Sequence, residues 1–307
     1  MTLVRRGSTS DAAQDRTPSV LKQCCAIAYE SEVAELLLGD SFHPGGRKLT
    51  ERLGEILGLS PRTRVLDVAE LWRRHPGAWT TVRDVAATHG AMHANAGRGP
   101  DGWASTYDRL VATSREASVA LYSLGSPELL AAATAEIVAY LRRYDLFGPT
   151  RKVLDLGCGI GRLVEALAPE VGSIVGADIS PEMARHARGR CSRFANALIV
   201  RTGGRDLAAF ADAAFDLVLA ADVFPYINDA GRELVWCTVA DAARVLIPGG
   251  TLVVLNFSYR GDTGADRADV RRLADEIGFD ILHNGARPFS FWDGVAFVLR
   301  RWRSQSC

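Results

Sequence analysis

The segment Val153–Arg162 most constrains how this chain can fold. It reads Val-Leu-Asp-Leu-Gly-Cys-Gly-Ile-Gly-Arg, so an apolar run stops at Asp155 and glycines follow at positions 157, 159 and 161. A short buried strand must end there, and the chain must then turn where a Cβ would obstruct a ligand. The apolar residues that come next predict a helix, whose first N–H groups favour an anionic or polar ligand group. This segment, the glycine loop, therefore predicts a nucleotide-binding turn.

From about residue 150 onward, short apolar strands alternate with helices. The strands are expected at 152–156, 173–178, 197–201, 215–220, 251–257, 279–284 and 295–300. The helices between them are expected at 162–168, 181–190, 230–246 and 266–277. Continuously apolar strands imply a parallel sheet covered on both faces, and right-handed crossovers bring the carboxyl ends of its strands to one edge. We therefore expect an α/β fold of the Rossmann-like type, with its ligand site at that edge.

Two acidic residues follow strands at this edge. Asp178 ends the second predicted strand, and Asp206 comes shortly after the third. A carboxylate at the tip of the second strand can accept hydrogen bonds from both ribose hydroxyls. A side-chain acceptor after the third strand could meet an adenine amino group. The glycine spacing differs from the Gly-x-Gly-x-x-Gly of dinucleotide enzymes, so the flanking residues decide which nucleotide is meant.

Composition argues against several other classes of protein. The 307 residues carry no formal net charge, which argues against a large nucleic-acid surface. No apolar run is long enough for a membrane span, and the N-terminus lacks the apolar region of a secretory signal. The six cysteines show no CxxC spacing, so no metal site is predicted. We expect a cytoplasmic protein with a small-molecule substrate, binding neither nucleic acid nor membrane.

Residues 150–303 resemble a class I S-adenosylmethionine-dependent methyltransferase. Besides the glycine loop, the matching motifs are Gly-Ala-Asp-Ile-Ser-Pro-Glu-Met at 176–183, Phe-Asp-Leu-Val-Leu-Ala-Ala-Asp at 215–222 and Val-Leu-Ile-Pro-Gly-Gly at 245–250. The resemblance implies a mostly parallel, seven-stranded sheet with helices on both faces, whose last strand, within Pro288–Trp302, is antiparallel. It also implies S-adenosylmethionine as cofactor and S-adenosylhomocysteine as its product.

The resemblance assigns cofactor contacts by position. The glycine loop should pass under the methionine part, Asp155 should position its amino group, and Asp178 should hold the ribose. Asp206 or the adjacent Arg205 backbone should face adenine, although the family often has Gly-Asp where this chain inserts Arg205. The full set of expected cofactor-binding residues is Asp155, Gly157, Cys158, Gly159, Gly161, Arg162, Asp178, Ile179, Arg205, Asp206 and Ala221.

The loop after the fourth predicted strand, residues 220–226, should lie beside the transferable methyl group. Methyl transfer requires nucleophile, methyl and sulfur in line, and a base only if the acceptor keeps its proton near neutral pH. Tyr226 and Asp222 are the predicted catalytic residues; the alternatives are a tyrosine packed over the sheet edge and a carboxylate bonded to backbone or cofactor. Residues 256–260 should also line the acceptor side. The expected substrate-binding residues are Tyr107, Phe224, Tyr226 and Arg260.

The first half of the chain is mainly helical by pattern. We expect a disordered leader over 1–18, a helical N-terminal cap over 19–145 and the methyltransferase domain over 146–307. Cap helices are predicted at 21–38, 106–124 and 128–140. In this family such segments form a lid and acceptor pocket. Residues 43–72 weakly echo the approach to the glycine loop but lack its glycines, and a helix over 65–72 is the simpler interpretation.

The sequence thus predicts a methyltransferase that modifies an oxygen, nitrogen or carbon of a small molecule, with secondary metabolism as one setting. Two alternatives stay open. The fold could bind the cofactor yet catalyse another reaction, such as a cyclisation. An arsenite methyltransferase-like enzyme is the other, suggested by Cys24-Cys25 together with Cys191 and Cys237. The sequence leaves the oligomeric state open, with a homodimer as the option considered.

Overall fold

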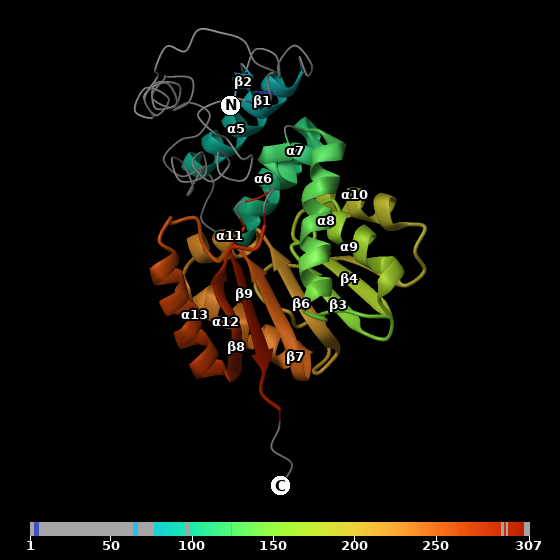
Figure 1. The fold of residues 1–307 in the computed structure, drawn as a ribbon, viewed down its shortest axis with the longest axis vertical. Coiled ribbons are helices and arrows are strands. Elements are labelled where there is room, and N and C mark those ends of the chain that lie inside the picture. Colours follow the sequence, from blue (N-terminus) through green and yellow to red (C-terminus); the bar gives the residue numbers. More distant parts are fainter. Residues whose placement is uncertain are drawn as a thin grey trace.

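The computed structural model describes residues 3–5, 64–66, 77–95, 99–123, 125–289, 292 and 294–303. Its centre is a seven-stranded sheet, shown in Figure 1. The strands are β3 (Lys152–Leu156), β4 (Ser173–Asp178), β5 (Ala197–Arg201), β6 (Phe215–Ala221), β7 (Leu246–Leu255), β8 (Phe279–Ala286) and β9 (Ala296–Arg301). Their order is β5-β4-β3-β6-β7-β9-β8, and β9 runs antiparallel to both of its neighbours. The predicted Rossmann-like sheet with an antiparallel last strand is confirmed.

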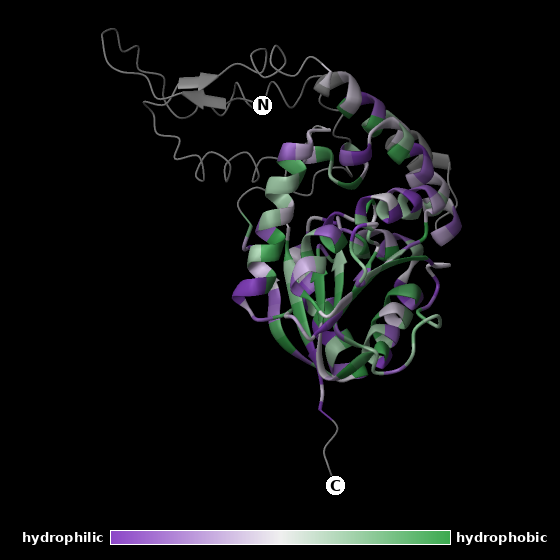
Figure 2. Cartoon of the chain, turned by 90° about the vertical axis from the view of Figure 1, so that its right-hand side faces the viewer, coloured by the Kyte–Doolittle hydropathy of each residue, from purple (hydrophilic) through white to green (hydrophobic). Residues whose placement is uncertain are grey.

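Helices cover both faces of the sheet (Figure 1). They are α8 (Pro127–Arg143), α9 (Arg162–Leu167), α10 (Pro181–Cys191), α11 (Phe224–Ala230), α12 (Arg232–Val245) and α13 (Thr263–Ile277), with a 3-10 turn η2 (Ala168–Glu170) after α9. Successive strand residues pack in opposite directions: Val153 belongs to a core cluster with α8, α9 and α10, whereas Leu154 belongs to one with α12 and α13. Both faces are therefore buried, which explains why the strands are continuously apolar. Figure 2 shows these strands mostly in the hydrophobic colours.

The chain reverses its direction of travel across the sheet at the centre. It moves outward from β3 to β4 and β5, then returns to β6 on the other side of β3 and continues to β7. Loops that follow β3 and β6 therefore leave in opposite directions, and the crevice between them is where open α/β sheets bind ligands. The glycine loop follows β3 and the 220–226 segment follows β6, so both predicted halves of the site meet there.

Three helices and a 3-10 turn come before α8 in the described part of the chain. They are α5 (Ala78–Asn95), α6 (Pro100–Thr113), α7 (Arg115–Val119) and the 3-10 turn η1 (Leu121–Ser123). The prediction of one helix over 106–124 is wrong. The backbone is extended at Ser114, with φ −159° and ψ 123°, and the Ser114 side chain accepts a hydrogen bond from the Ala117 N–H to begin α7. A serine that caps a new helix separates two segments whose apolar spacing reads as one.

The predicted domain boundary after residue 145 assigns α8 to the N-terminal cap, although α8 packs against the sheet and its helices. Ile137 and Leu141 on α8 are fully buried in the same core cluster as Val153 on β3. Of the 43–72 echo, the structure describes only Arg64–Leu66, which form β2 and pair antiparallel with β1 (Leu3–Arg5), not a helix. The predicted helix at 21–38 and Cys24-Cys25 lie outside the described residues.

No helix within the part of the chain that the structure describes is both long enough and apolar enough to span a membrane.

Candidate functional site

A cavity of about 290 Å³ lies at the carboxyl edge of the sheet. Its lining comes from the ends of β3, β4, β6 and β7 and from α6 and the segment after it. The lining residues used below are Pro100, Trp103, Tyr107, Val119, Gly157, Gly159, Asp178, Ile179, Asp206, Ala221, Asp222, Val223, Tyr226, Asn256, Tyr259 and Asp266. One cavity thus joins the glycine loop to the segment after β6, as the switch in strand order requires.

Gly157 and Gly159 are glycines for two reasons. Their φ angles are +71° and +53°, a region that residues with a Cβ rarely adopt. A Cβ on Gly157 would lie 2.6 Å from Val223 Cγ2, and one on Gly159 would lie 2.7 Å from Val119 Cγ1. The loop therefore presents bare backbone to the cavity, between side chains that leave no room for a methyl group.

Asp178 closes the loop from the neighbouring strand. Its Oδ2 accepts a hydrogen bond from the Gly159 N–H at 2.7 Å, and its Oδ1 accepts one from the Ser180 N–H at 2.9 Å. The residue is 8% exposed, and burial raises the pKa of its carboxyl to about 6. A carboxylate oxygen has more than one lone pair, so each oxygen can accept a further bond from a ligand in the cavity.

Asp155 lies deeper, at the end of β3, and does not line the cavity. It is 1% exposed, and its Oδ2 has no hydrogen-bond partner within the described residues. Burial raises the pKa of this carboxyl to about 7, against the opposing effect of the Arg162 guanidinium. Arg162 is itself buried and donates to the Thr134 hydroxyl at 3.2 Å. A buried acceptor without a partner next to a glycine loop suits a ligand that brings a donor.

The opposite end of the cavity is organised by two residues at positive φ. Asp222 (φ +58°) and Asn256 (φ +64°) follow the adjacent strands β6 and β7. Asn256 Nδ2 donates to Asp222 Oδ1 at 2.7 Å, and the Tyr259 hydroxyl donates to the same oxygen at 3.1 Å. Asn256 is held in turn by Val295, which donates its N–H to the amide oxygen and accepts from the Asn256 N–H, both at 2.8 Å. Strained backbone stabilised from several sides is typical of functional sites.

Aromatic rings surround this carboxylate. The Tyr226 ring makes edge contacts with Trp103, Tyr107 and Tyr259, at centroid distances of 4.7, 5.4 and 6.1 Å. Burial raises the pKa of Tyr226 to about 12 and moves those of Tyr107 and Tyr259 upward as well. The three hydroxyls therefore stay protonated at neutral pH, where they can orient an acceptor but are poor bases.

A family profile described as a methyltransferase domain matches residues 154–254, which include the glycine loop, Asp178 and Asp222. Residues 154–254 therefore match the methyltransferase-domain family, whose cofactor is S-adenosylmethionine.

Two relatives by sequence match a little over a third of this chain. The demethylmenaquinone methyltransferase of Tropheryma whipplei is 44% identical over 108 residues, which are 35% of this chain and 42% of that protein. The 2-methyl-6-phytyl-1,4-hydroquinone methyltransferase of Synechocystis is 32% identical over 122 residues, 38% of this chain and 36% of that protein. The matches thus span less than half the length of these two relatives. Among solved structures, phosphoethanolamine N-methyltransferase 1 of Haemonchus contortus has a TM-score of 0.54 at 15% identity, covering 68% of this chain and 50% of that one, and it shares the fold.

The features of the cavity fit the cofactor of this methyltransferase family. Bare backbone at Gly157 and Gly159 accommodates close approach, and Asp178 lies at a strand tip where a ribose can donate to it. The Asp155 Oδ2 without a partner suits the cofactor's amino group. Ile179, Asp206 and Ala221 also line the cavity.

Four other predicted cofactor residues do not line the cavity. Cys158 and Gly161 lie within the loop but do not line the cavity, and neither does Arg162. Arg205 points to the cap, where it pairs with Asp101 at 3.0 Å with both side chains mostly exposed. Like Asp155, these residues support or flank the cavity without lining it.

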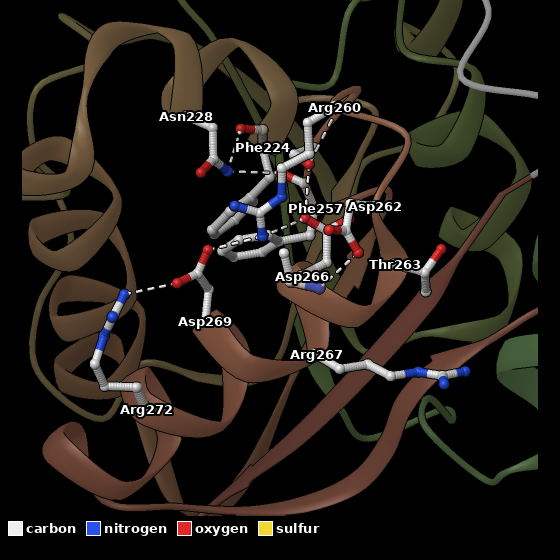
Figure 3. Close-up of polar contacts among 12 residues, drawn as sticks. Phe224, Asn228, Phe257, Arg260, Asp262, Thr263, Asp266, Arg267, Asp269 and Arg272 are labelled. Carbon is white, nitrogen blue, oxygen red and sulfur yellow. Dashed lines mark hydrogen bonds and ion pairs between the residues drawn. The ribbon is translucent and has the colours of Figure 1, made fainter.

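Two predicted acceptor residues also lie outside the cavity. Phe224 is fully buried in the core and stacks on Phe257 at 5.8 Å, because the segment after β6 continues as α11 instead of remaining a loop. Arg260 pairs with Asp266 and Asp269 on α13, each at 2.7 Å (Figure 3). Neither residue is in a position to grip a substrate. The end of the cavity around Asp222 is lined by Trp103 together with the predicted Tyr107, Tyr226, Asn256 and Tyr259.

The cysteines among the described residues do not come together at the cavity. The Cys158 and Cys191 thiols are buried and donate to the Gly159 and Gly161 carbonyls at 3.8 and 3.6 Å. Across the described ranges, no group of three potential metal ligands comes together. The described cysteines thus give no support to the arsenite alternative.

Cofactor binding should weaken in acid because of Asp178. Burial raises the pKa of the folded carboxyl from 3.8 to about 6. Below that pH the carboxyl is protonated and accepts ribose hydrogen bonds poorly, so affinity for S-adenosylhomocysteine should be about tenfold weaker near pH 5 than near pH 7.5. Isothermal titration calorimetry across this range measures it, and an Asp178→Asn variant should lose the change near pH 6. If the affinity of the wild-type protein does not change over this pH range, Asp178 does not hold the ribose.

The same raised pKa predicts the sign of the stability change. The folded state holds the proton more tightly than the unfolded one, so this carboxyl favours folding most below pH 3.8 and loses that contribution as pH rises through about 6.

Breaking the Arg260 contacts should affect stability and spare the cofactor. Arg260→Ala leaves the mostly buried Asp266 with the Ser258 hydroxyl, which donates to it at 2.6 Å. Because Arg260 is partly exposed, we expect unfolding free energy to fall by only about 1 kcal/mol. Urea denaturation measures this loss. Arg272→Ala, which removes an exposed partner of Asp269, is the matched control and should cost less than about 0.5 kcal/mol.

Proposed function

We propose that the protein is an enzyme that transfers the methyl group of S-adenosylmethionine to a small-molecule acceptor. One observation carries the proposal: the glycine loop and Asp178 line the same cavity as Asp222 and Tyr226. A binding module would need only the first pair. A methyltransferase needs both, because the methyl group must pass from the cofactor to an acceptor held beside it.

In the cofactor half of the cavity, Gly157, Gly159 and Asp178 would hold the cofactor, and Asp155 lies deeper behind them. When bound, S-adenosylmethionine supplies a methyl group on a positively charged sulfur. The chain's own contribution at this half is alignment, because backbone and carboxylate groups are fixed before the ligand arrives: Asp178 already holds the Gly159 and Ser180 N–H groups.

The acceptor half offers the Asp222 carboxylate and three neutral phenols. We assign Tyr226 to orient the acceptor, because its buried hydroxyl stays protonated and its ring contacts three others. We assign Asp222 as the group that can accept a proton from a hydroxyl or ammonium acceptor. Asn256 and Tyr259 hold its Oδ1 in place for that role. An acceptor that reacts through carbon would use the same rings for stacking.

The test has two stages. Purified protein titrated with S-adenosylhomocysteine should show a micromolar Kd, and absence of binding would reject the proposal. Incubation with S-adenosylmethionine and candidate acceptors should then give a product heavier by one CH2 group by mass spectrometry. The names of the two sequence relatives make hydroxylated quinol-type rings the first acceptors to try, followed by amines. A cofactor-dependent product of unchanged mass would favour the cyclisation alternative over methyl transfer.

A further inference from the structure

Asp108 on α6 reaches the start of α10, outside the cavity lining. The Ser180 hydroxyl donates to Asp108 Oδ1 at 2.5 Å, and the Glu182 N–H donates to the same oxygen at 3.2 Å. Ser180 is fully buried and caps α10 by accepting the Met183 N–H at 3.0 Å. The hydroxyl thus accepts from the Met183 N–H with one of its two lone pairs and gives its single proton to Asp108.

The same serine also holds the proposed ribose carboxylate. Its N–H donates to Asp178 Oδ1 at 2.9 Å. Asp108, Ser180 and Asp178 therefore form a connected chain of polar contacts from the cap to the cofactor site. Asp178 continues this chain to the glycine loop through the Gly159 N–H. A shift of Ser180 would thus move a donor of Asp178, and with it the carboxylate itself.

The helix that carries Asp108 touches both halves of the cavity. Trp103 and Tyr107 on α6 belong to the acceptor half. Pro100, at its first turn, lines the cavity beside the loop after β5, where a Cβ on Gly204 would lie 3.1 Å from the Pro100 Cβ. α6 precedes the matched methyltransferase segment 154–254 in the sequence, so the methyltransferase motifs do not include this contact.

We propose that Asp108 is a positioning residue of the cofactor site, which holds Ser180 and through it the Asp178 carboxylate in the geometry that binds the ribose. The proposal rests on the proposed function, because it needs the cofactor to bind at Asp178. A purely structural role is the competing explanation: Asp108 also satisfies the Glu182 N–H, one of the donors that a helix start leaves without an intrahelical partner. Affinity and stability respond differently in the two cases.

The test compares two substitutions at one position. Asp108→Ala removes the acceptor of both hydrogen bonds and should weaken S-adenosylhomocysteine binding about tenfold by calorimetry. Asp108→Asn keeps an oxygen acceptor in place and should stay within about threefold of wild type. The matched control is Asp101→Ala on the same helix, which breaks only the exposed pair with Arg205 and should leave Kd within about twofold.

A second measurement separates positioning from stability. Hydrogen exchange over residues 100–113 should slow when S-adenosylhomocysteine binds to wild type, and this protection should be reduced in Asp108→Ala. If Asp108→Ala lowers Tm but keeps the wild-type Kd and protection, the positioning role is wrong and the structural one stands. If Asp108→Ala does not fold, Asp108→Glu, which keeps the charge but shifts the oxygens, should weaken binding, and unchanged affinity would overturn the proposal. Failure of wild type to bind at all rejects the proposed function instead.

Discussion

Replacing Asp178 by alanine should weaken S-adenosylhomocysteine binding by about 10- to 150-fold, the equivalent of about 1.5–3 kcal/mol of charge-assisted hydrogen bonding. The substitution removes the proposed ribose acceptor. It also leaves the Gly159 and Ser180 N–H groups without the oxygens that hold them, so the loop loses its fixed shape. Calorimetry near neutral pH, where the wild-type carboxylate is ionised, measures the change in Kd.

The control for this substitution is an aspartate that is absent from the cavity. Asp212 is mostly exposed and pairs with Arg244 before β6, so Asp212→Ala should leave Kd unchanged. If Asp178→Ala binds as tightly as wild type while remaining folded, Asp178 does not hold the ribose.

Gly159→Ala should abolish measurable binding of S-adenosylhomocysteine and destabilise the fold. An alanine at φ +53° costs about 1–2 kcal/mol, and its Cβ would lie 2.7 Å from Val119 Cγ1. Because Val119 ends α7, relief of the clash must displace either α7 or the loop that faces the cofactor. We expect the unfolding free energy to fall by about 1–3 kcal/mol in urea denaturation.

Two further variants divide this effect into its causes. Gly203→Ala is the control, since nothing lies within 4 Å of its Cβ and its φ is not positive, and it should behave like wild type. Adding Val119→Ala to Gly159→Ala should recover the part of the stability lost to the clash but not the part lost to backbone strain. A Gly159→Ala protein that binds normally would show that the cofactor does not approach this backbone.

The sheet was predictable because its signals are local. Strands at 152–156, 173–178 and 197–201 have the expected bounds, and the remaining strands differ by a few residues at their ends, since apolar runs bounded by glycine or acid leave little choice of register. β7 differs most: it begins at Leu246 and runs through Pro248-Gly249-Gly250, ahead of the predicted start at residue 251. The cofactor end followed from the same local signals at Gly157, Gly159 and Asp178.

The acceptor end was harder to predict because it depends on which way a segment rotates after its strand ends. The 220–226 segment was identified, but α11 begins within it at Phe224 and directs that ring into the core while Tyr226 faces the cavity. The charge of Arg260 predicts a substrate contact, yet the direction of its side chain is decided by Asp266 and Asp269 on a helix that comes later in the chain. Asp108 carried no local signal, since its partner lies 72 residues away.

The two hydrogen bonds between Val295 and Asn256 determine the order in which the parts of the site can form during synthesis. Asp222 and Asn256 leave the ribosome well before Val295, yet the two hydrogen bonds that fix Asn256 need the residue that leads into β9. The glycine loop and Asp178 can assemble once β3 and β4 pair, whereas the acceptor end stays incomplete until the last strand inserts between β7 and β8. A nascent chain would thus acquire its ability to hold cofactor before its ability to place an acceptor.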